Sequence, residues 1–398
     1  TAPAPGQGPS PAAGGTTQTP NGQSGPLSDV VLGSFGVEAG ILGAVTGPAP
    51  PAIRAWASMI NSRGGLAGHR VRVILADDGN DPARAQAVVR QLVEQDKVIA
   101  FINEYTLNTL GAVTPYLGEK QIPVVGSIGG DLVGGGSSMM FNPLAGSFGL
   151  SHAWATLLTI NAMSERKKLG LVYCREVNGC QTYADNIKKL MPYGGLDIVY
   201  EGQVSLAQPD YTAEMIQAEG AGAEVLFVLL DSSAIVRVAR SAHRQNYEPT
   251  LVAAFNASHD VVFTGGKDVE GLLVGGRYAP WDSSPFVADY REAMATYQPN
   301  APRGDLGGGV FILGRLFETK IAPFLEEPPT SAQILEGLFS LDKETLDGRL
   351  PGISFPKGSR ENVNLCTVPM KLVNGKFTTL DPAASFVCAP GWKPASRG

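Results

Sequence analysis

Hydroxyl, acidic and aromatic side chains stand directly after several predicted strands of this 398-residue chain. Tyr105 and Thr106 follow the apolar run at 98–103, and Ser127 follows the run at 122–126. In open α/β sheets, ligands bind outside the carboxyl ends of the strands, where helix N-termini offer free N–H groups to carboxylates. The pattern therefore predicts a small-molecule site at the strand ends, with further candidates at Ile128, Gly129, Asn178, Asp231, Phe255 and Tyr278.

Several of these candidates also have a structural interpretation. Thr106 can cap the helix expected over 106–118, and Asp231 can cap the helix expected over 232–245. The aromatic side chains can line a site or serve as ordinary packing; they are Tyr105, Phe255, Tyr278 and Trp281. Both interpretations stay open at this point.

The sequence offers no catalytic constellation. It contains neither a G-x-S-x-G elbow nor a G-x-x-x-x-G-K-[ST] phosphate loop. The glycines at 33–47 do not have G-x-G-x-x-G spacing and are expected in a loop at the lip of a cleft. No pair among His69, His152, His243 and His259 has H-x-x-x-H spacing. We therefore expect no enzyme, no metal site and no cofactor.

The elements that would position the candidate residues alternate between strand and helix. Residues 58–85 read as a helix end, a glycine turn, a strand and a second helix that begins at Asp81-Pro82. Further strand–helix alternations follow over 98–141 and again over 169–277. This pattern predicts an α/β fold of two doubly wound parallel-sheet lobes joined by a multi-strand hinge.

The chain divides into three predicted regions. Residues 1–27 are rich in Pro, Gly, Ser and Thr, which predicts a disordered stalk. The N-terminal lobe is expected to comprise 28–143 and 280–350, and the C-terminal lobe 144–279 and 351–390. The first passage between lobes is placed near 141–143, and Asn374-Gly375 is expected to turn a closing hairpin.

Two segments resemble signatures of a known family. The run INSRGGLAGHRV…ADDGNDPARA at 60–85 is similar to I-N-x-x-G-G-[IL]-x-G-x-x-[IV], then D-D and D-P, in the branched-chain amino acid (Leu/Ile/Val) receptor family of ABC transporters. These are type I periplasmic solute-binding proteins. The run GISFPKG at 352–358 resembles the late G-x-[IV]-x-F-[DN]-x-x-G element, with Pro356 departing from it. The resemblance extends from about residue 30 to 380.

The resemblance implies roles for the strand-end residues. Thr106 matches the hydroxyl that holds a ligand carboxylate, and Ser127 lies near the second position that binds the amino-acid head. Phe255 stands where amino-acid receptors place the glutamate that pairs with the ammonium, while Asp231 could replace that carboxylate. The implied ligand is an amino acid or an aromatic or other organic carboxylate, with an unmodified amino acid in doubt.

Composition and cysteines indicate where the protein works. A net charge of -6 argues against a nucleic-acid partner. Four cysteines form two local pairs, Cys174 with Cys180 and Cys366 with Cys388; reduced thiols are the alternative. Disulfides would place the protein outside the cytoplasm, at the cell surface or in the periplasm. The expected function is delivery of a small ligand to an ABC permease by cleft closure, with the membrane contacted only through a possible lipid anchor upstream of Thr1. A ligand sensor that regulates a partner protein is the alternative.

Overall fold

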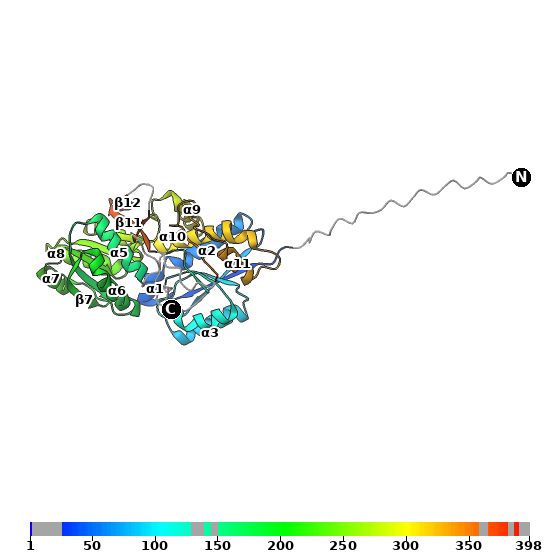
Figure 1. The fold of residues 1–398 in the computed structure, drawn as a ribbon, viewed down its shortest axis with the longest axis horizontal. Coiled ribbons are helices and arrows are strands. Elements are labelled where there is room, and N and C mark those ends of the chain that lie inside the picture. Colours follow the sequence, from blue (N-terminus) through cyan, green and yellow to red (C-terminus); the bar gives the residue numbers. More distant parts are fainter. Residues whose placement is uncertain (2–25, 129–138, 145–149, 358–364, 381–385, 390–398) are drawn as a thin grey trace.

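The computed structural model of the protein describes residue 1 and residues 26–128, 139–144, 150–357, 365–380 and 386–389. The described strands form two sheets, and helices pack against each of them. Figure 1 shows helices α5 to α8 gathered around one sheet and α2, α3 and α11 around the other. This is the predicted pair of α/β lobes. Residues 2–25 of the predicted stalk and the candidate Gly129 lie outside the described residues.

The first sheet is parallel throughout, in the order β2-β1-β3-β4-β5. Its register places Glu104 at the end of β3 beside Ser127 at the end of β4. The strands are β1 (Val30–Gly36), β2 (Val71–Asp77), β3 (Ala100–Glu104), β4 (Val124–Ser127) and β5 (Met140–Phe141).

Two pairs of helices bury the two faces of this sheet. Helices α2 (Ala49–Ser62) and α10 (Asp305–Leu316) share a core with Leu32 and Ile102. Helices α3 (Pro82–Glu94) and α4 (Leu110–Lys120) pack on the opposite face, around Phe101. The other described helices of this half are α1 (Gly40–Thr46), α9 (Ala288–Tyr297), α11 (Ser331–Phe339) and the short η4 (Pro285–Val287), η5 (Phe317–Ile321) and η6 (Ala322–Phe324).

The second sheet has the order β12-β11-β10-β9-β8-β6-β7, with β13 paired to β11. Five strands are parallel: β6 (Lys168–Cys174), β7 (Asp197–Val204), β8 (Val225–Leu229), β9 (Thr250–Ala254) and β10 (Leu273–Gly276). The antiparallel strands are β11 (Cys366–Val373), β12 (Lys376–Thr379) and β13 (Val387–Cys388). The helices are α5 (Leu150–Met163), α6 (Asn178–Gly194), α7 (Thr212–Gly220), α8 (Ser232–Arg244), η2 (Phe255–Ala257) and η3 (Asp260–Val269).

Local sequence signals explain where several elements begin and turn. Asp81 accepts a hydrogen bond from the Arg84 N–H at 2.8 Å and so caps α3, as the Asp-Pro pair predicts. Gly65 has φ +79°, and a Cβ there would stand 1.9 Å from the His69 carbonyl oxygen, so only glycine fits this turn. Asn374 and Gly375 both have positive φ and turn the predicted hairpin between β11 and β12.

Some elements differ from the sequence-based expectation. The predicted glycine loop at 40–47 contains helix α1, since Val45 is buried in the core and the Thr46 hydroxyl bonds the Val37 carbonyl. Helix α5 was not predicted. Helix α4 begins at Leu110 rather than at 106, because residues 106–109 form a separate hydrogen-bonded turn. The expectation that Thr106 starts this helix is therefore wrong.

Both predicted cysteine pairs are disulfide bonded, Cys174 to Cys180 and Cys366 to Cys388. Both cysteines of the first pair are buried. Helix α6 begins at Asn178, so Cys180 lies inside its first turn and the bond ties that turn to the end of β6. The bond therefore fixes the start of α6 at the carboxyl edge of the second sheet.

The chain passes between the two sheets after β5, after β10 and before β11. At the second passage the Tyr278 hydroxyl donates to the carbonyl of Asp305, the first residue of α10. The Asp305 N–H in turn donates to the Ser258 carbonyl at 3.0 Å, beside the second sheet. These bonds attach α10, which covers the first sheet, to the carboxyl edge of the second.

Candidate ligand-binding site

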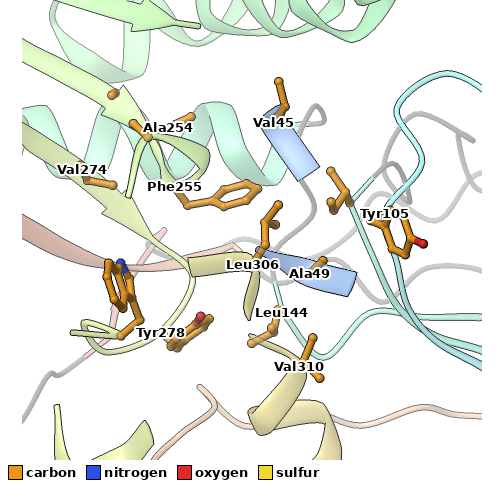
Figure 2. Close-up of a cluster of buried hydrophobic side chains, with 14 of the residues drawn as sticks. Val45, Ala49, Tyr105, Leu144, Ala254, Phe255, Val274, Tyr278, Leu306 and Val310 are labelled. Atoms are coloured by element: carbon orange, nitrogen blue, oxygen red, sulfur yellow. The ribbon is translucent and has the colours of Figure 1, made fainter. Parts of the chain in front are cut away.

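The carboxyl edges of the two sheets approach each other, and the predicted site residues lie along them. Figure 2 shows Phe255, after β9, and Tyr105, after β3, on opposite sides of Val45, Ala49 and Leu306. The rim is closed by a bond between the edges: the Asn178 N–H donates to Asn108 Oδ1 at 3.3 Å. The two edges therefore form one candidate site. The predicted residues of the first edge contact other protein groups than those of the second edge.

The first-sheet edge is built on two buried carboxyl groups, Glu104 and Asp78. Glu104 bonds the Ser127 hydroxyl and accepts from the Thr106 N–H. Asp78 accepts from the Thr109 hydroxyl, which is itself bonded to the Thr106 hydroxyl. The five side chains and the Thr106 N–H form a hydrogen-bonded chain that joins the ends of β2, β3 and β4.

This chain of bonds changes the role expected for Thr106. Because the Thr109 hydroxyl donates its proton to Asp78, the Thr106 hydroxyl must donate to Thr109 Oγ1. Its proton is therefore directed at the protein, and its N–H is bonded to Glu104. In this arrangement Thr106 has no donor left for a ligand carboxylate.

Burial raises the pKa of Glu104 from 4.5 to about 8, with nearby Asp78 adding a smaller upward push against the lowering effect of the Ser127 and Thr106 bonds. Glu104 consequently keeps its proton at neutral pH. A neutral carboxyl group can accept and donate hydrogen bonds, and Glu104 is held in place by the Thr106 N–H and the Ser127 hydroxyl. This edge is thus suited to a neutral polar group or to a hydrogen-bond donor.

Two further predicted residues support the same edge. The buried Tyr105 hydroxyl donates to Glu38 Oε1 at 2.6 Å, so the ring faces the hydrophobic cluster of Figure 2 while the hydroxyl is held outside it. The Ile128 N–H donates to the Glu104 carbonyl at 3.1 Å and fixes the start of the loop after β4. Both residues position the edge through contacts within the protein.

On the second-sheet edge, Asn178 and Asp231 both lie at the N-termini of helices. Asn178 begins α6 and bonds Asn108 of the other edge through its N–H. Asp231 caps α8, since Oδ1 accepts from the Ala234 N–H at 3.1 Å and Oδ2 accepts from the Ser233 hydroxyl at 2.7 Å. Both oxygens of Asp231 are therefore engaged by its own helix, which is the capping interpretation.

Phe255 and Tyr278 are both buried at this edge. The Phe255 ring packs edge-on against His152 of α5, with centroids 4.6 Å apart. Its face carries the Arg277 guanidinium, whose Cζ lies 4.2 Å from the ring centroid. Tyr278 packs against Gly308 of α10 and donates to Asp305. Phe255 and Tyr278 are thus packed within the protein at this edge, with one buried cation over the Phe255 ring, while Tyr105 lies on the other edge and Trp281 packs against Phe263.

Sequence reasoning missed the charged members of both edges. Glu104, Asp78 and Arg277 were not singled out, although Glu104 and Arg277 directly end or follow apolar strands. A charged residue at the end of a fully buried strand was the available signal. His152 gave no local signal, because its contact with Phe255 joins residues about a hundred positions apart.

A hollow of about 480 Å³ lies at the opposite edge of the second sheet. It is lined at the amino ends of β9 and β10 by residues that include Thr250 and Leu272, and by both acidic and basic side chains. Ligands of open α/β sheets bind at the other edge. The carboxyl ends are therefore the better candidate for a ligand site.

No group of three or more His, Cys, Asp or Glu side chains in the described part of the chain is arranged to hold a metal ion. No helix within the described ranges is long and apolar enough to cross a membrane.

Comparisons with known proteins identify the family. The chain is 27% identical over 258 residues to an amino acid binding protein of Pseudomonas aeruginosa, covering 62% of this chain and 67% of the relative. A branched-chain amino acid ABC transporter structure from Thermus thermophilus with bound valine superposes with a TM-score of 0.76 at 17% identity, covering 91% of this chain and 97% of that one. A fatty acid ABC transporter substrate-binding protein from Thermomonospora curvata gives a TM-score of 0.72 at 16% identity, covering 89% and 92%. Residues 31–363 match the model of the Periplasmic binding protein family, and with its two α/β lobes the chain therefore belongs to the type I periplasmic binding proteins, the family of the branched-chain amino acid receptors.

Proposed function

We propose that this protein is an extracytoplasmic receptor that binds a small organic ligand between its lobes and delivers it to an ABC importer. The observation that carries the proposal is the meeting of the two carboxyl edges, joined by the Asn178–Asn108 bond. Family membership supports a solute-binding role. The two disulfides support an oxidising location outside the cytoplasm.

Cleft closure would follow from the way the chain joins the lobes. We assign residues 28–143 and 280–350 to one lobe, and 144–279 and 351–390 to the other. The chain passages that connect them are few, so a hinge motion would change the distance between the edges with little change inside either lobe. A ligand that bonds both edges would favour the closed arrangement by its differential affinity for it.

The ligand class follows from the two edges. Phe255 and Tyr105 offer apolar ring surface on opposite sides of the site (Figure 2), and buried carboxyl and guanidinium groups offer polar contacts. This supports a small organic acid or an amino acid with an apolar or aromatic body. Amino acids and fatty acids, the ligands in the names of two of the similar proteins, both belong to this general class of compound.

Binding by the purified protein tests the proposal. We expect at least one member of a panel of leucine, valine, phenylacetate, 4-methylpentanoate and octanoate to raise the Tm and to give a saturable calorimetric isotherm. Small-angle X-ray scattering should then show a smaller radius of gyration with that ligand. An unchanged Tm with all panel members, at concentrations up to the millimolar range, would refute this ligand class.

A further inference from the structure

Arg277 is a buried cation that the family assignment does not explain. It directly follows β10 and is 3% exposed. Its Nε donates to Asp305 Oδ2 at 2.9 Å, and its guanidinium lies over the Phe255 ring. Its Nη2 makes no hydrogen bond within the described part of the chain. One end of the guanidinium is therefore paired, and the other end is a buried donor without an acceptor.

The fold makes room for this unpaired end. Nη2 lies against Gly309 of α10, 3.1 Å from where a Cβ on that residue would stand, and the Leu144 side chain is the next neighbour of that point. A side chain at 309 would make a tight contact with the guanidinium, which would have to shift slightly to admit it. The unpaired N–H groups thus lie next to α10, where the chain passes between the two sheets, and not within either sheet.

An unpaired buried N–H of a charged group is costly, and native proteins rarely retain one without an acceptor. The charged and titratable groups around Arg277 are Asp305, His259 and Tyr278. Asp305 already accepts from Nε, and Tyr278 donates to the Asp305 carbonyl. Burial and the charge of Arg277 lower the pKa of His259 to about 3, so this histidine is neutral and adds no acceptor charge. An anion is therefore the acceptor that would best satisfy the unpaired Nη2.

The opposite edge of the site carries carboxyl groups instead of a cation. Glu104 and Asp78 supply two buried carboxyl groups there, and Thr106 directs its hydroxyl proton into the protein. That edge therefore has no free Thr106 hydroxyl proton for a ligand carboxylate. The Arg277 side offers a guanidinium and the Phe255 ring. The two edges therefore favour one orientation of an acidic ligand.

We propose that Arg277 binds the carboxylate of the ligand, so that the acid points toward the second sheet and the neutral end toward Glu104. This proposal rests on the proposed receptor function and names its ligand as a small monocarboxylate with an apolar or aromatic body. An α-ammonium group, fixed next to the carboxylate, would lie close to the guanidinium and to no free carboxylate, because Asp305 is engaged by Arg277. Simple carboxylic acids should consequently bind more tightly than α-amino acids of the same body.

The first test uses the unmodified protein and matched pairs of probes. Isothermal titration calorimetry at pH 7 compares phenylacetate with phenylacetamide and 4-methylpentanoate with 4-methylpentanamide and with leucine. We expect the acid of at least one pair to bind about tenfold or more tightly than its amide, the change that the loss of one charge-assisted hydrogen bond produces. Amides that bind as tightly as the acids, or leucine that binds more tightly than 4-methylpentanoate, would overturn the assignment of Arg277 but leave a working receptor.

The second test uses variants that keep the buried site electrically balanced. Arg277→Gln combined with Asp305→Asn removes the pair without leaving an unpaired buried carboxylate. We expect this double variant to lose the acid-over-amide preference, and Asp305→Asn alone to keep it. Arg349→Gln is the matched control, since its guanidinium also lies over a phenylalanine ring, 5.5 Å from Phe286, but bonds the Leu346 and Phe286 carbonyls.

The outcomes separate the two proposals. A double variant that retains the wild-type preference overturns the role of Arg277, whatever the affinity. If the double variant does not fold, judged by circular dichroism, the acid-to-amide ratio of the unmodified protein still decides. If neither acids, amides nor leucine bind the unmodified protein, the proposed ligand class and the Arg277 assignment both fail.

Discussion

The two edges of the site are built in different ways. The first-sheet edge is a hydrogen-bonded chain of short polar side chains on buried carboxyl groups, Glu104 and Asp78. The second-sheet edge is an aromatic cluster around one cation, with Phe255 packed between His152 and Arg277. The stability of the first edge depends on where its protons lie, so it should change with pH. The stability of the second edge depends on packing, so it should fall when a substitution creates a cavity. The predictions below test that contrast from the largest effect to the smallest.

The largest effect is expected from Phe255→Ala on the second edge. The ring is fully buried and contacts both His152 and Arg277. Its removal therefore leaves a cavity and takes away the aromatic face over which the guanidinium lies. We expect the free energy of unfolding in urea to fall by about 3–5 kcal/mol. Tyr105→Phe on the first edge keeps its ring and loses only the bond to Glu38, and should cost about 1 kcal/mol. Equal costs for the two variants would contradict the contrast.

The second prediction concerns pH and the first edge. The pKa of Glu104 is raised by burial from 4.5 in the unfolded chain to about 8 in the folded protein, so the folded state binds the proton more tightly. The stability that this group contributes is full below pH 4.5 and is lost as the pH rises through 8. We expect the unfolding free energy of the wild type to fall by roughly 2–4 kcal/mol between pH 5 and pH 9.

Glu104→Gln should flatten that pH profile, because the amide does not titrate and can still accept from the Thr106 N–H. Glu94→Gln is the matched control, since Glu94 lies on the surface of α3 and bonds the Tyr116 hydroxyl. This control should retain the wild-type slope. A Glu104→Gln profile as steep as the wild type's would mean that other groups carry the pH dependence.

Much of the fold could be predicted because its signals are local. The glycines of the 64–68 turn, the Asp81 cap and the Asn374-Gly375 hairpin each act within a few residues, and each has the predicted conformation. Helix α1 could not be predicted, since its sequence GILGAVT includes two glycines and it is held by burial of Val45 and the Thr46–Val37 bond. Tertiary packing overrides intrinsic propensity there.

The site was harder to predict, because its decisive contacts join distant residues. Thr106 and Ser127 were found from their places after apolar strands, but their role depends on Glu104, which the fold sets beside Ser127 through the β3–β4 register. Arg277 depends on Asp305, 28 positions later, and on Phe255. Spacing along the chain indicates which residues reach an edge, but not which of them pair once they are there.

A smaller effect is expected from the disulfide at the second edge. Cys174→Ala combined with Cys180→Ala releases a loop of 6 residues, for which chain entropy alone gives a loss of about 2 kcal/mol. The pair Cys366 and Cys388 is 22 residues apart, and its double alanine variant should lose about 3 kcal/mol. Urea unfolding without reductant measures both. The opposite order would show that packing of the buried cysteines outweighs the loop entropy.

The smallest effect is expected where the two edges meet. Asn108 Oδ1 accepts the exposed Asn178 N–H at 3.3 Å, and Asn108 Nδ2 donates to Asn80 Oδ1 at 3.1 Å, which holds the amide in position. Asn108→Ala removes this bond between the edges and should weaken ligand binding by about two- to tenfold, the value of a single neutral hydrogen bond. Because the contact joins polar groups at the surface of the rim, the urea midpoint should not change.

Asn80→Gly is the matched control for the rim. Asn80 has φ +58°, which glycine adopts without strain, and the substitution removes only the bond that positions Asn108. Its effect on affinity should therefore be smaller than that of Asn108→Ala. Calorimetry with whichever acid binds the wild type most tightly gives both values. If Asn108→Ala binds that acid with unchanged affinity, the bond does not form in the liganded state, and the acidic and cationic edges must be brought together by the ligand alone.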